Sequence, residues 1–426
     1  MIEKIYRIFL ASTGVCTDTR SITEGNLFVA LKGPNFNANS FAAKALEMGA
    51  SHAIIDDESY VVPGKTTLVE DGLATLQELA VFHRRQLKIP VIGITGSNGK
   101  TTTKELMHTV LQAQYNTFAT KGNLNNHIGV PLSVLDIREN HEMAIIEMGA
   151  NHVGEIAQLS AICRPTHGLI TNIGKAHIGL FGGIEGIIRG KSELYDFLIK
   201  QEGTIFVNQN QEKLMNMKKR MNAPILYPNR DGYYHCKLID ADPYVKIETK
   251  DGNVVNTNLV GAYNFDNIAT ALCIGKYFKV PNTNANNAVA NYIPENNRSQ
   301  ILKKGSNSII LDAYNANPSS MEKALENLSN MKGSRRIAII GDMFELGDDT
   351  VKEHAYIGAK LKELNIQDAF FCGSAMQAAY DAYSEGHYMM TKDLLISYLK
   401  ENKFADSTIL IKASRGIALE DVVKYI

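Results

Sequence analysis

One stretch of the 426-residue chain constrains its fold more than any other. The apolar run IPVIGIT leads into TGSNGK, and the helix-forming run KTTTKELMHTVLQA follows. A strand, a glycine-rich turn and a helix in this order surround a phosphate with backbone N–H groups. Lys100 then reaches the β- and γ-phosphates, and the Thr101 hydroxyl reaches Mg²⁺. The usual spacing requires glycine at position 94, but this chain has Ile94, with glycines at 93, 96 and 99.

Strands and helices alternate along the whole chain, which is too long for one ordinary core. We predict an α/β protein of three domains, with boundaries at 1–89, 90–297 and 298–426. The first is a small α/β domain, and the second is a phosphate-loop domain with a mostly parallel sheet. Within the second, the segment around Asp251 and Gly252 favours antiparallel hairpins. The third reads as a doubly wound, Rossmann-like domain.

Composition excludes several classes of protein. Formal net charge is −1 and no basic patch stands out, so a nucleic-acid partner is not expected. The five cysteines are scattered and form no C-x-x-C pair, which argues against a disulfide framework or a zinc site and favours a reducing cytoplasm. No apolar run approaches the ~18 residues that span a bilayer, so no membrane insertion is expected.

Polar residues follow several of the predicted strands. Glu147 ends MAIIE beside the loop, where a carboxylate is placed to hold Mg²⁺, and Asp312 directly follows NSIIL, where a ribose could be bound. Each has an ordinary alternative, namely a surface carboxylate or part of a turn. By composition alone, His177 is structural and Lys191 is a solvated helix lysine. Asn264 and Asn267 could face one side of a helix start or cap it.

The spacing G-x-x-G-x-x-G-K-T resembles the ATP loop of the Mur ligases and of their relative folylpolyglutamate synthase. The resemblance continues in matching order over nearly the whole chain, through the strings TDTRSITEGNLFVALKG, GAYNFDNIATA, LDAYNANP, GDMFELG and IKASRGIALE. The last three are similar to the family members that add D-alanyl-D-alanine, and the D-N-P-R string of the diaminopimelate- or lysine-adding members is absent. Departures occur at Thr19, at Ala413 and Leu419, and at 37–39, where Asn-Ala-Asn replaces the family's D-G-H.

This resemblance implies an ATP-dependent, ADP-forming amide ligase of cytoplasmic peptidoglycan precursor synthesis. The carboxylate of UDP-N-acetylmuramoyl-tripeptide would attack ATP to form an acyl phosphate, which the amine of D-alanyl-D-alanine then attacks. The first domain would bind the uridine nucleotide, and the linker near 298 would be the hinge of domain closure in a monomer. Alternatives are a Mur-type ligase adding a single amino acid, folylpolyglutamate synthase, a phosphate-loop NTPase switch or a non-catalytic sugar-nucleotide-binding protein. The sequence leaves open whether the third residue of the tripeptide is diaminopimelate or lysine.

The resemblance also implies roles for individual residues. Lys100, His177 and Lys191 would be catalytic. Two Mg²⁺ ions would be held by Thr101, Glu147, His177 and Lys191, the last as a carbamate formed with CO₂. ATP would be bound by Gly96, Ser97, Asn98, Gly99, Lys100, Thr101, Thr102, Asn264, Asn267, Arg298, Asp312 and Tyr314. The substrates would be bound by Thr19, Arg20, Thr120, Asn123, Asn125, Asn126, Asn315, Asn317 and Arg415.

Overall fold

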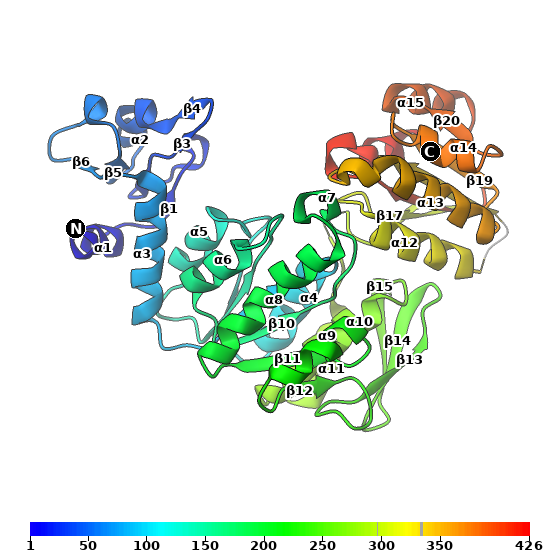
Figure 1. The fold of residues 1–426 in the computed structure, drawn as a ribbon, viewed down its shortest axis with the longest axis horizontal. Helices are drawn as coiled ribbons and strands as arrows, with labels where there is room; N and C mark the ends of the chain where they lie inside the picture. Colours follow the sequence, from blue (N-terminus) through cyan, green and yellow to red (C-terminus); the bar gives the residue numbers. More distant parts are fainter. Residues whose placement is uncertain (296, 333–334) are drawn as a thin grey trace.

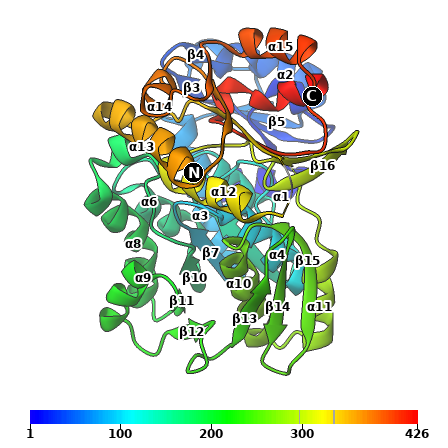
Figure 2. The same ribbon diagram turned by 90° about the vertical axis from the view of Figure 1, so that its right-hand side faces the viewer.

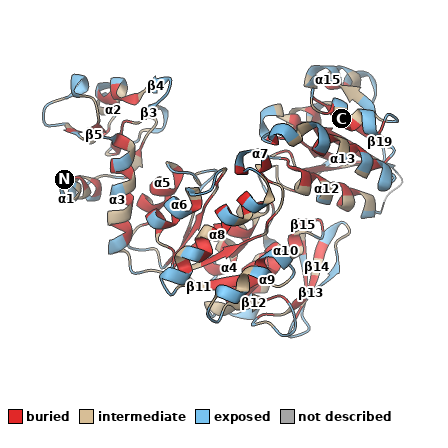
Figure 3. Cartoon of the chain, viewed as in Figure 1, coloured by how far each residue is buried: buried red, intermediate tan, exposed pale blue. Residues whose placement is uncertain are grey.

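The computed structural model describes residues 1–295, 297–332 and 335–426. Three α/β units follow one another along the chain, and the two outer units lie on the same side of the central one (Figures 1 and 2). Strands are buried in each unit, while the surface helices expose one face (Figure 3). The predicted α/β class is confirmed, and the domain boundaries at 89/90 and 297/298 stay a prediction. No helix in the described ranges is long and apolar enough to cross a bilayer.

The N-terminal unit is a small parallel sheet with strand order β1-β2-β5-β6. Its strands are β1 (Val15–Cys16), β2 (Leu27–Val29), β5 (His52–Ile55) and β6 (Thr66–Leu68). Helix α1 (Ile2–Leu10) precedes the sheet, and the short pair β3 (Lys32–Gly33) and β4 (Phe36–Asn37) leads to α2 (Ala42–Glu47). A 3₁₀ turn, Ala38–Phe41, comes directly before α2.

Helix α3 (Gly72–Gln86) joins this unit to the central one (Figure 1). It packs against α1 on one side and against α5 (Gly129–Leu135) and α6 (Glu155–Cys163) on the other. Its Leu76 and Leu79 are fully buried in that core, and Arg84 Nε donates to the Cys163 carbonyl at 2.9 Å. The N-terminal sheet is thereby anchored to the central unit through the buried face of α3.

The central sheet is parallel, with strand order β12-β11-β10-β7-β9-β8. Side chains of β7 (Val91–Thr95) alternate between two cores: Val91 faces the core that contains α5, α6 and α8 (Ile184–Lys200), and Ile92 and Ile94 face that of α4 (Lys100–Gln112) and α10 (Asn264–Tyr277). The remaining strands are β8 (Thr117–Ala119), β9 (Met143–Glu147), β10 (His167–Ile170), β11 (Thr204–Asn208) and β12 (Ile225–Tyr227). Because β7 lies between β9 and β10, the chain diverges to both sides of it, which is where such sheets bind ligands.

The predicted hairpins are confirmed as a separate antiparallel sheet, β13 (Cys236–Asp240), β14 (Tyr244–Thr249) and β15 (Val254–Val260). Gly252 takes a φ of 76° in the turn between the last two strands. The Asn-rich stretch that follows α10 contains α11 (Asn282–Asn291), and residue 296 lies outside the described residues.

The C-terminal sheet has the order β16-β17-β21-β18-β19-β20. Its parallel strands include β17 (Asn307–Leu311), β18 (Arg335–Gly341), β19 (Asp368–Cys372) and β21 (Ser407–Lys412), as a doubly wound domain requires. The helices are α12 (Pro318–Asn330), α13 (Thr350–Glu363), α14 (Gln377–Ala382) and α15 (Lys392–Glu401). Strand β20 (His387–Met389) is also parallel, whereas β16 (Gln300–Lys304) is an antiparallel strand at the edge of the sheet.

Candidate active site

The glycine-rich loop turns sharply between β7 and α4. Gly96 has a φ of 142° and Gly99 a φ of 76°, both in the region that side chains disfavour. A Cβ atom at Gly96 would overlap the Thr171 hydroxyl, and one at Gly99 would lie 2.7 Å from Asn267 Oδ1. Both glycines are therefore required by backbone conformation and by the close approach of neighbouring residues.

The departure at Ile94 has a structural reason. Ile94 is fully buried in β7, within the core shared with α4 and α10. The strand continues to Thr95, so the loop starts one residue later and needs no glycine at position 94. The spacing is thus consistent with a phosphate loop that starts from a longer strand.

Lys100 folds back over the loop. Its Nζ donates to the carbonyls of Gly96 at 2.8 Å and Ser97 at 3.3 Å. Burial lowers the pKa of Lys100, and the nearby Glu147 carboxylate opposes that shift. The ammonium is therefore already held by the loop that an incoming phosphate would occupy.

Glu147 is a buried carboxylate with one oxygen unused. Its side chain ends β9 and is 2% exposed. Oε1 accepts from the Thr101 hydroxyl at 3.3 Å and from Asn125 Nδ2 at 2.9 Å. Oε2 is buried with no hydrogen-bond partner. A buried carboxylate oxygen without a partner is costly, so this one is suited to a cation.

Thr120 supports Glu147 from behind. Its hydroxyl accepts from the Glu147 N–H at 3.0 Å, and its carbonyl accepts from Lys104 Nζ at 2.7 Å. The side chain is 1% exposed and does not line the cavity described below. In this structure Thr120 therefore positions Glu147, and the substrate contact predicted for Thr120 stays a prediction.

His177 begins α7 (Ile178–Phe181) with a φ of 55°. Its Nδ1 lies against the carboxylate of Glu345, from the GDMFELG string of the C-terminal unit. Burial lowers the pKa of His177; the Glu345 carboxylate opposes that shift, and Lys100 and Lys191 add to it. A neutral imidazole is the form that binds a metal ion.

Lys191 lies inside α8 with 1% of its surface exposed. Its Nζ donates to the Ala150 carbonyl at 3.0 Å and lies 5.1 Å from the centre of the Phe181 ring. Burial, followed by the charge of Lys100, lowers the pKa of Lys191 well below its usual value. The interpretation of Lys191 as a solvated surface lysine is wrong, because the amine is enclosed beside the site.

These residues fit Mg²⁺ although the described part of the chain contains no cluster of three or more His, Cys, Asp or Glu residues that could hold a metal. Mg²⁺ in nucleotide sites is commonly bound through one or two carboxylates, a hydroxyl, water and the phosphates themselves. The unpaired oxygen of Glu147 beside the Thr101 hydroxyl supplies that minimal set.

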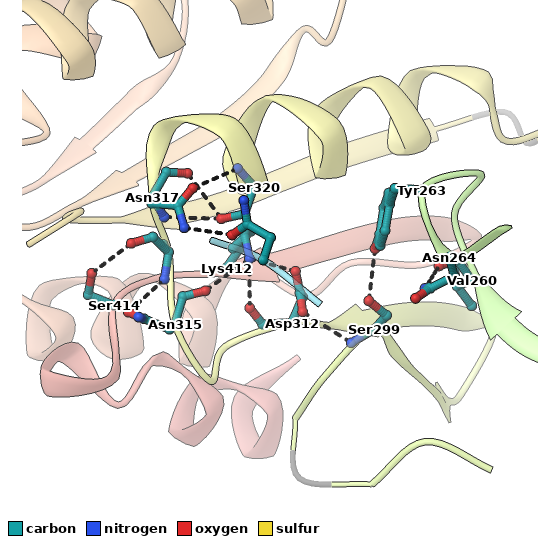
Figure 4. A network of polar contacts seen from close by, with 12 residues as sticks. Val260, Tyr263, Asn264, Ser299, Asp312, Asn315, Asn317, Ser320, Lys412 and Ser414 are labelled. Atoms are coloured by element: carbon teal, nitrogen blue, oxygen red, sulfur yellow. Dashed lines mark hydrogen bonds and ion pairs between the residues drawn. The ribbon is translucent and has the colours of Figure 1, made fainter. Parts of the chain in front are cut away.

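The C-terminal unit contributes a second group of polar side chains (Figure 4). Asp312, after β17, accepts from the Ser299 N–H at 3.1 Å and pairs with Lys412 Nζ at 2.6 Å. Lys412 also donates to the Asn315 carbonyl at 3.0 Å and is 2% exposed. The sequence analysis missed Lys412, whose only signal was a charge at the end of the apolar run STILIK.

Arg298 stacks on Tyr314, with its guanidinium carbon 3.6 Å from the ring centre. Its Nε is buried without a hydrogen-bond partner. The stack fixes the plane of the guanidinium, and planar guanidinium groups bind phosphate oxygens in pairs. The arginine and the tyrosine predicted to bind ATP are thus brought together.

Asn264 and Asn267 lie on the same side of the start of α10 and bond to each other, as one of the two interpretations required. Asn264 Nδ2 donates to the Val260 carbonyl at 2.8 Å, and its Oδ1 accepts from Asn267 at 2.7 Å. Asn267 Oδ1 accepts from the Thr103 hydroxyl at 3.0 Å. Helix α10 has no side-chain cap, so capping by Asn264 is excluded.

A cavity of about 540 Å³ lies between the central and C-terminal units. Most of the predicted site residues line it: Ser97, Asn98, Gly99, Lys100, Thr101, Thr102, Asn123, Asn125, Asn126, Glu147, His177, Asn264, Asn267, Arg298, Asp312, Tyr314, Asn315 and Asn317. Residues that were not predicted also line it, including Tyr263, Ser320, Lys323 and Lys412. Gly96 and Lys191 do not line the cavity, but each is hydrogen-bonded to a residue that does. The Gly96 carbonyl accepts from Lys100, and Lys191 donates to the Ala150 carbonyl.

Besides Thr120, three predicted substrate residues lie outside this cavity. Arg415 is paired with Glu420, and its side chain is 60% exposed. Thr19 and Arg20 belong to the N-terminal unit, where Arg20 forms an ion pair with Asp18 at 2.6 Å. The structure does not bring these residues together with the cavity, and their substrate contacts stay a prediction.

The segment at 37–39 has a structural role. Asn39 is fully buried; its Nδ2 donates to Asp56 at 2.7 Å, and its Oδ1 accepts from the Asp56 N–H at 2.9 Å. Asn37 Oδ1 accepts from the Asn39 N–H at 3.0 Å. This part of the loop is therefore internally bonded and closes the end of β5.

Comparisons with known proteins agree with this geometry. The model of the Mur ligase middle domain matches residues 94–275, and that of the Mur ligase glutamate ligase domain matches 297–415. A UDP-N-acetylmuramoyl-tripeptide–D-alanyl-D-alanine ligase of Bacillus subtilis is 35% identical over 96% of this chain and 92% of its own length. The Escherichia coli enzyme of that name is 32% identical over 96% and 92%.

Solved structures give the same result. MurF from Acinetobacter baumannii superposes with a TM-score of 0.88 at 29% identity, covering 100% of this chain and 98% of that one. MurF ligase from Thermotoga maritima in complex with ADP superposes with a TM-score of 0.86 at 26% identity, covering 98% and 97%. Fold and site thus define a ligase built around a phosphate loop. The chain belongs to the Mur ligase family.

Proposed function

We propose that this chain is an ATP-dependent, ADP-forming ligase that adds D-alanyl-D-alanine to UDP-N-acetylmuramoyl-tripeptide in peptidoglycan precursor synthesis. The observation that carries the proposal is the cavity in which the phosphate loop, the unpaired Glu147 oxygen and the Arg298–Tyr314 stack converge. Full-length similarity to ligases of that name supports the choice of substrates. The ADP complex of the Thermotoga relative supports ATP as the nucleotide.

The first step joins two anions, so neutralisation of charge is the main task of the site. The tripeptide carboxylate would attack the γ-phosphorus, an acyl phosphate would form, and ADP would leave. Lys100, held over the loop, and Arg298, held on Tyr314, are placed to bind the phosphate oxygens. Bound Mg²⁺ would neutralise the developing charge, and Thr101, Glu147 and His177 would hold it.

Lys191 is proposed as the source of a second anionic ligand. A neutral lysine amine adds to the carbon of CO₂ and loses a proton, which converts the side chain into a carbamate anion. The burial that lowers the pKa of Lys191 favours the neutral amine required for this addition. The carbamate would be available to a second Mg²⁺.

In the second step the amine of D-alanyl-D-alanine would attack the acyl carbon, and phosphate would leave. An acyl phosphate hydrolyses if water reaches it, so the intermediate must be enclosed. The cavity is closed by residues of two units, among them Asn98 and Asn317, whose amides bond at 2.7 Å. Asn123, Asn125 and Asn126, on the loop after β8, are proposed to contact the acceptor substrate.

Phosphate release with ATP and UDP-N-acetylmuramoyl-tripeptide tests the proposal. D-Alanyl-D-alanine, lysine, diaminopimelate and glutamate are compared as amines, each with tripeptides ending in lysine and in diaminopimelate. Release that depends on D-alanyl-D-alanine is expected, and Lys100→Met should abolish it. Release with a single amino acid instead, or with a folate and glutamate, would reject the proposed acceptor.

We also propose a cytoplasmic, monomeric enzyme. All five cysteines are buried and free, which suits a reducing compartment. The cavity is formed by residues of one chain, so no second copy is needed to complete it. Light scattering on a sizing column checks the oligomeric state, and a stable dimer would contradict this part.

A further inference from the structure

Residues 171–177, the bridging segment, follow β10 and contact the phosphate loop. The Thr171 hydroxyl donates to the Asn98 carbonyl at 2.6 Å, and the Ser97 N–H donates to the Asn172 carbonyl at 3.0 Å. The Ser97 hydroxyl donates to the Gly174 carbonyl at 2.9 Å and accepts from the Gly174 N–H at 2.9 Å. Several hydrogen bonds therefore hold the bridging segment against the phosphate loop.

The same segment contacts the C-terminal unit with its other side. The Lys175 N–H donates to the Ser319 hydroxyl in the first turn of α12 at 2.9 Å. Lys175 Nζ pairs with Glu353 Oε1 of α13 at 2.6 Å. A Cβ at Gly174 would lie 3.0 Å from Ser319 Oγ, so the backbones are already closely packed.

The Lys175–Glu353 pair is asymmetric. The Glu353 side chain is 3% exposed and its Oε2 is buried without a partner, whereas the Lys175 side chain is 43% exposed. An ionised carboxylate in such a place needs its cation, because removing one partner leaves an uncompensated charge. Separation of the two units would break this ion pair. The pair thus favours docking only while both charges are present.

We propose that Lys175 and Glu353 are positioning residues, which dock the C-terminal unit on the phosphate loop so that docking and nucleotide binding reinforce each other. Docking places Asn317 Nδ2 2.7 Å from Asn98 Oδ1 and sets the Glu345 carboxylate against His177. It also closes the cavity that Lys100 and Asp312 line from opposite sides. The inference rests on the proposed nucleotide site and on neither peptide substrate.

Calorimetric titration with Mg-ADP and small-angle scattering test this inference on the full chain. Lys175→Met and Glu353→Gln should each weaken ADP binding about tenfold, because a smaller fraction of molecules is docked. Both variants should also give a larger radius of gyration. The double variant should be no weaker than either single one, and the exchange K175E with E353K should restore part of the affinity.

Lys352→Met is the matched control, since Lys352 directly precedes Glu353 in the chain and its side chain is 78% exposed. It should bind ADP as the parent chain does. A KM for ATP that rises in Lys175→Met and Glu353→Gln while the melting temperature holds separates docking from general destabilisation. Parent-like ADP binding in either single variant, or independent effects in the double variant, would overturn the inference. Loss of ligase activity with these ADP results intact would count against the proposed reaction alone.

Discussion

Two buried carboxylates, Asp56 and Glu147, each lie at the end of a strand of a parallel sheet, and they differ in their hydrogen-bond partners. Asp56, after β5, accepts from the Gly72 N–H at 3.0 Å and from Asn39 at 2.7 Å, and pairs with Lys32 at 3.0 Å. Glu147, the last residue of β9, leaves Oε2 without a partner. Asp56 has hydrogen-bond and ion-pair partners in the chain, whereas the unpaired oxygen of Glu147 is suited to a bound cation. Both carboxylates lie at the end of a strand, so only their hydrogen-bond partners separate the structural carboxylate, Asp56, from the functional one, Glu147.

The largest effect is expected from Lys191, the most enclosed charge of the central site. Lys191→Ala should lower kcat by about 10³-fold or more, since a metal ligand would be lost, while the melting temperature holds. Short-chain carboxylates should restore part of the activity by replacing the carbamate. Lys200→Ala, at the exposed end of the same helix, is the control. Full activity of Lys191→Ala would eliminate the carbamate.

Glu147→Gln and Asp56→Asn test the comparison directly. Glu147→Gln should lower kcat about 100-fold and should not destabilise the fold, because the buried charge that it removes has one oxygen without a partner. Asp56→Asn should leave kcat nearly unchanged and reduce stability by about 1–3 kcal/mol, because several donors lose their acceptor. Urea unfolding and phosphate-release kinetics on both variants give the answer. The reverse pattern would end the distinction drawn between the two carboxylates.

A histidine at the start of a central strand, far along that strand from the loop, should affect stability rather than activity. Burial lowers the pKa of His167, at the start of β10, to about 4 from 6.5. Between these two pH values His167 is protonated in the unfolded chain but neutral in the folded chain. Stability is therefore lost as pH falls from 6.5 towards 4. Between pH 7 and 5 this loss is about 2 kcal/mol, from 1.36 kcal/mol per pKa unit. His167→Gln should flatten that dependence in urea unfolding, whereas His387→Gln, on an exposed strand of the C-terminal unit, should not.

The smallest effect separates two glycines with the same φ of 76°, Gly99 and Gly252. Alanine at either should cost about 1–2 kcal/mol, because the left-handed conformation disfavours a side chain. Only Gly99→Ala should also weaken ADP binding, by about tenfold, since its Cβ would press on Asn267 Oδ1. No heavy atom lies within 4 Å of a Cβ at Gly252. Equal ADP binding by both variants would show that the loop tolerates the extra carbon.

Much of the site could be predicted because its residues lie at fixed places on local elements. Glycines between a strand and a helix, and polar residues after apolar strands, identified the loop, Glu147 and Asp312. Lys412 and β16 were missed because a lysine at a strand end and a polar edge strand look like surface. Arg415 was predicted from its string, but the structure pairs it with Glu420 outside the cavity.

The sequence by itself determined the fold class, the phosphate loop and the order of family motifs, because hydrophobic period and turn chemistry act over short distances. Only the tertiary structure decided which polar atoms have partners. In that structure Lys191 is buried and donates to a backbone carbonyl, one oxygen of Glu147 has no partner, and Asn39 is hydrogen-bonded to Asp56. It also paired Lys175 with Glu353, 178 positions away in the chain. Partners so distant are set by the packing of whole units, which no local pattern records.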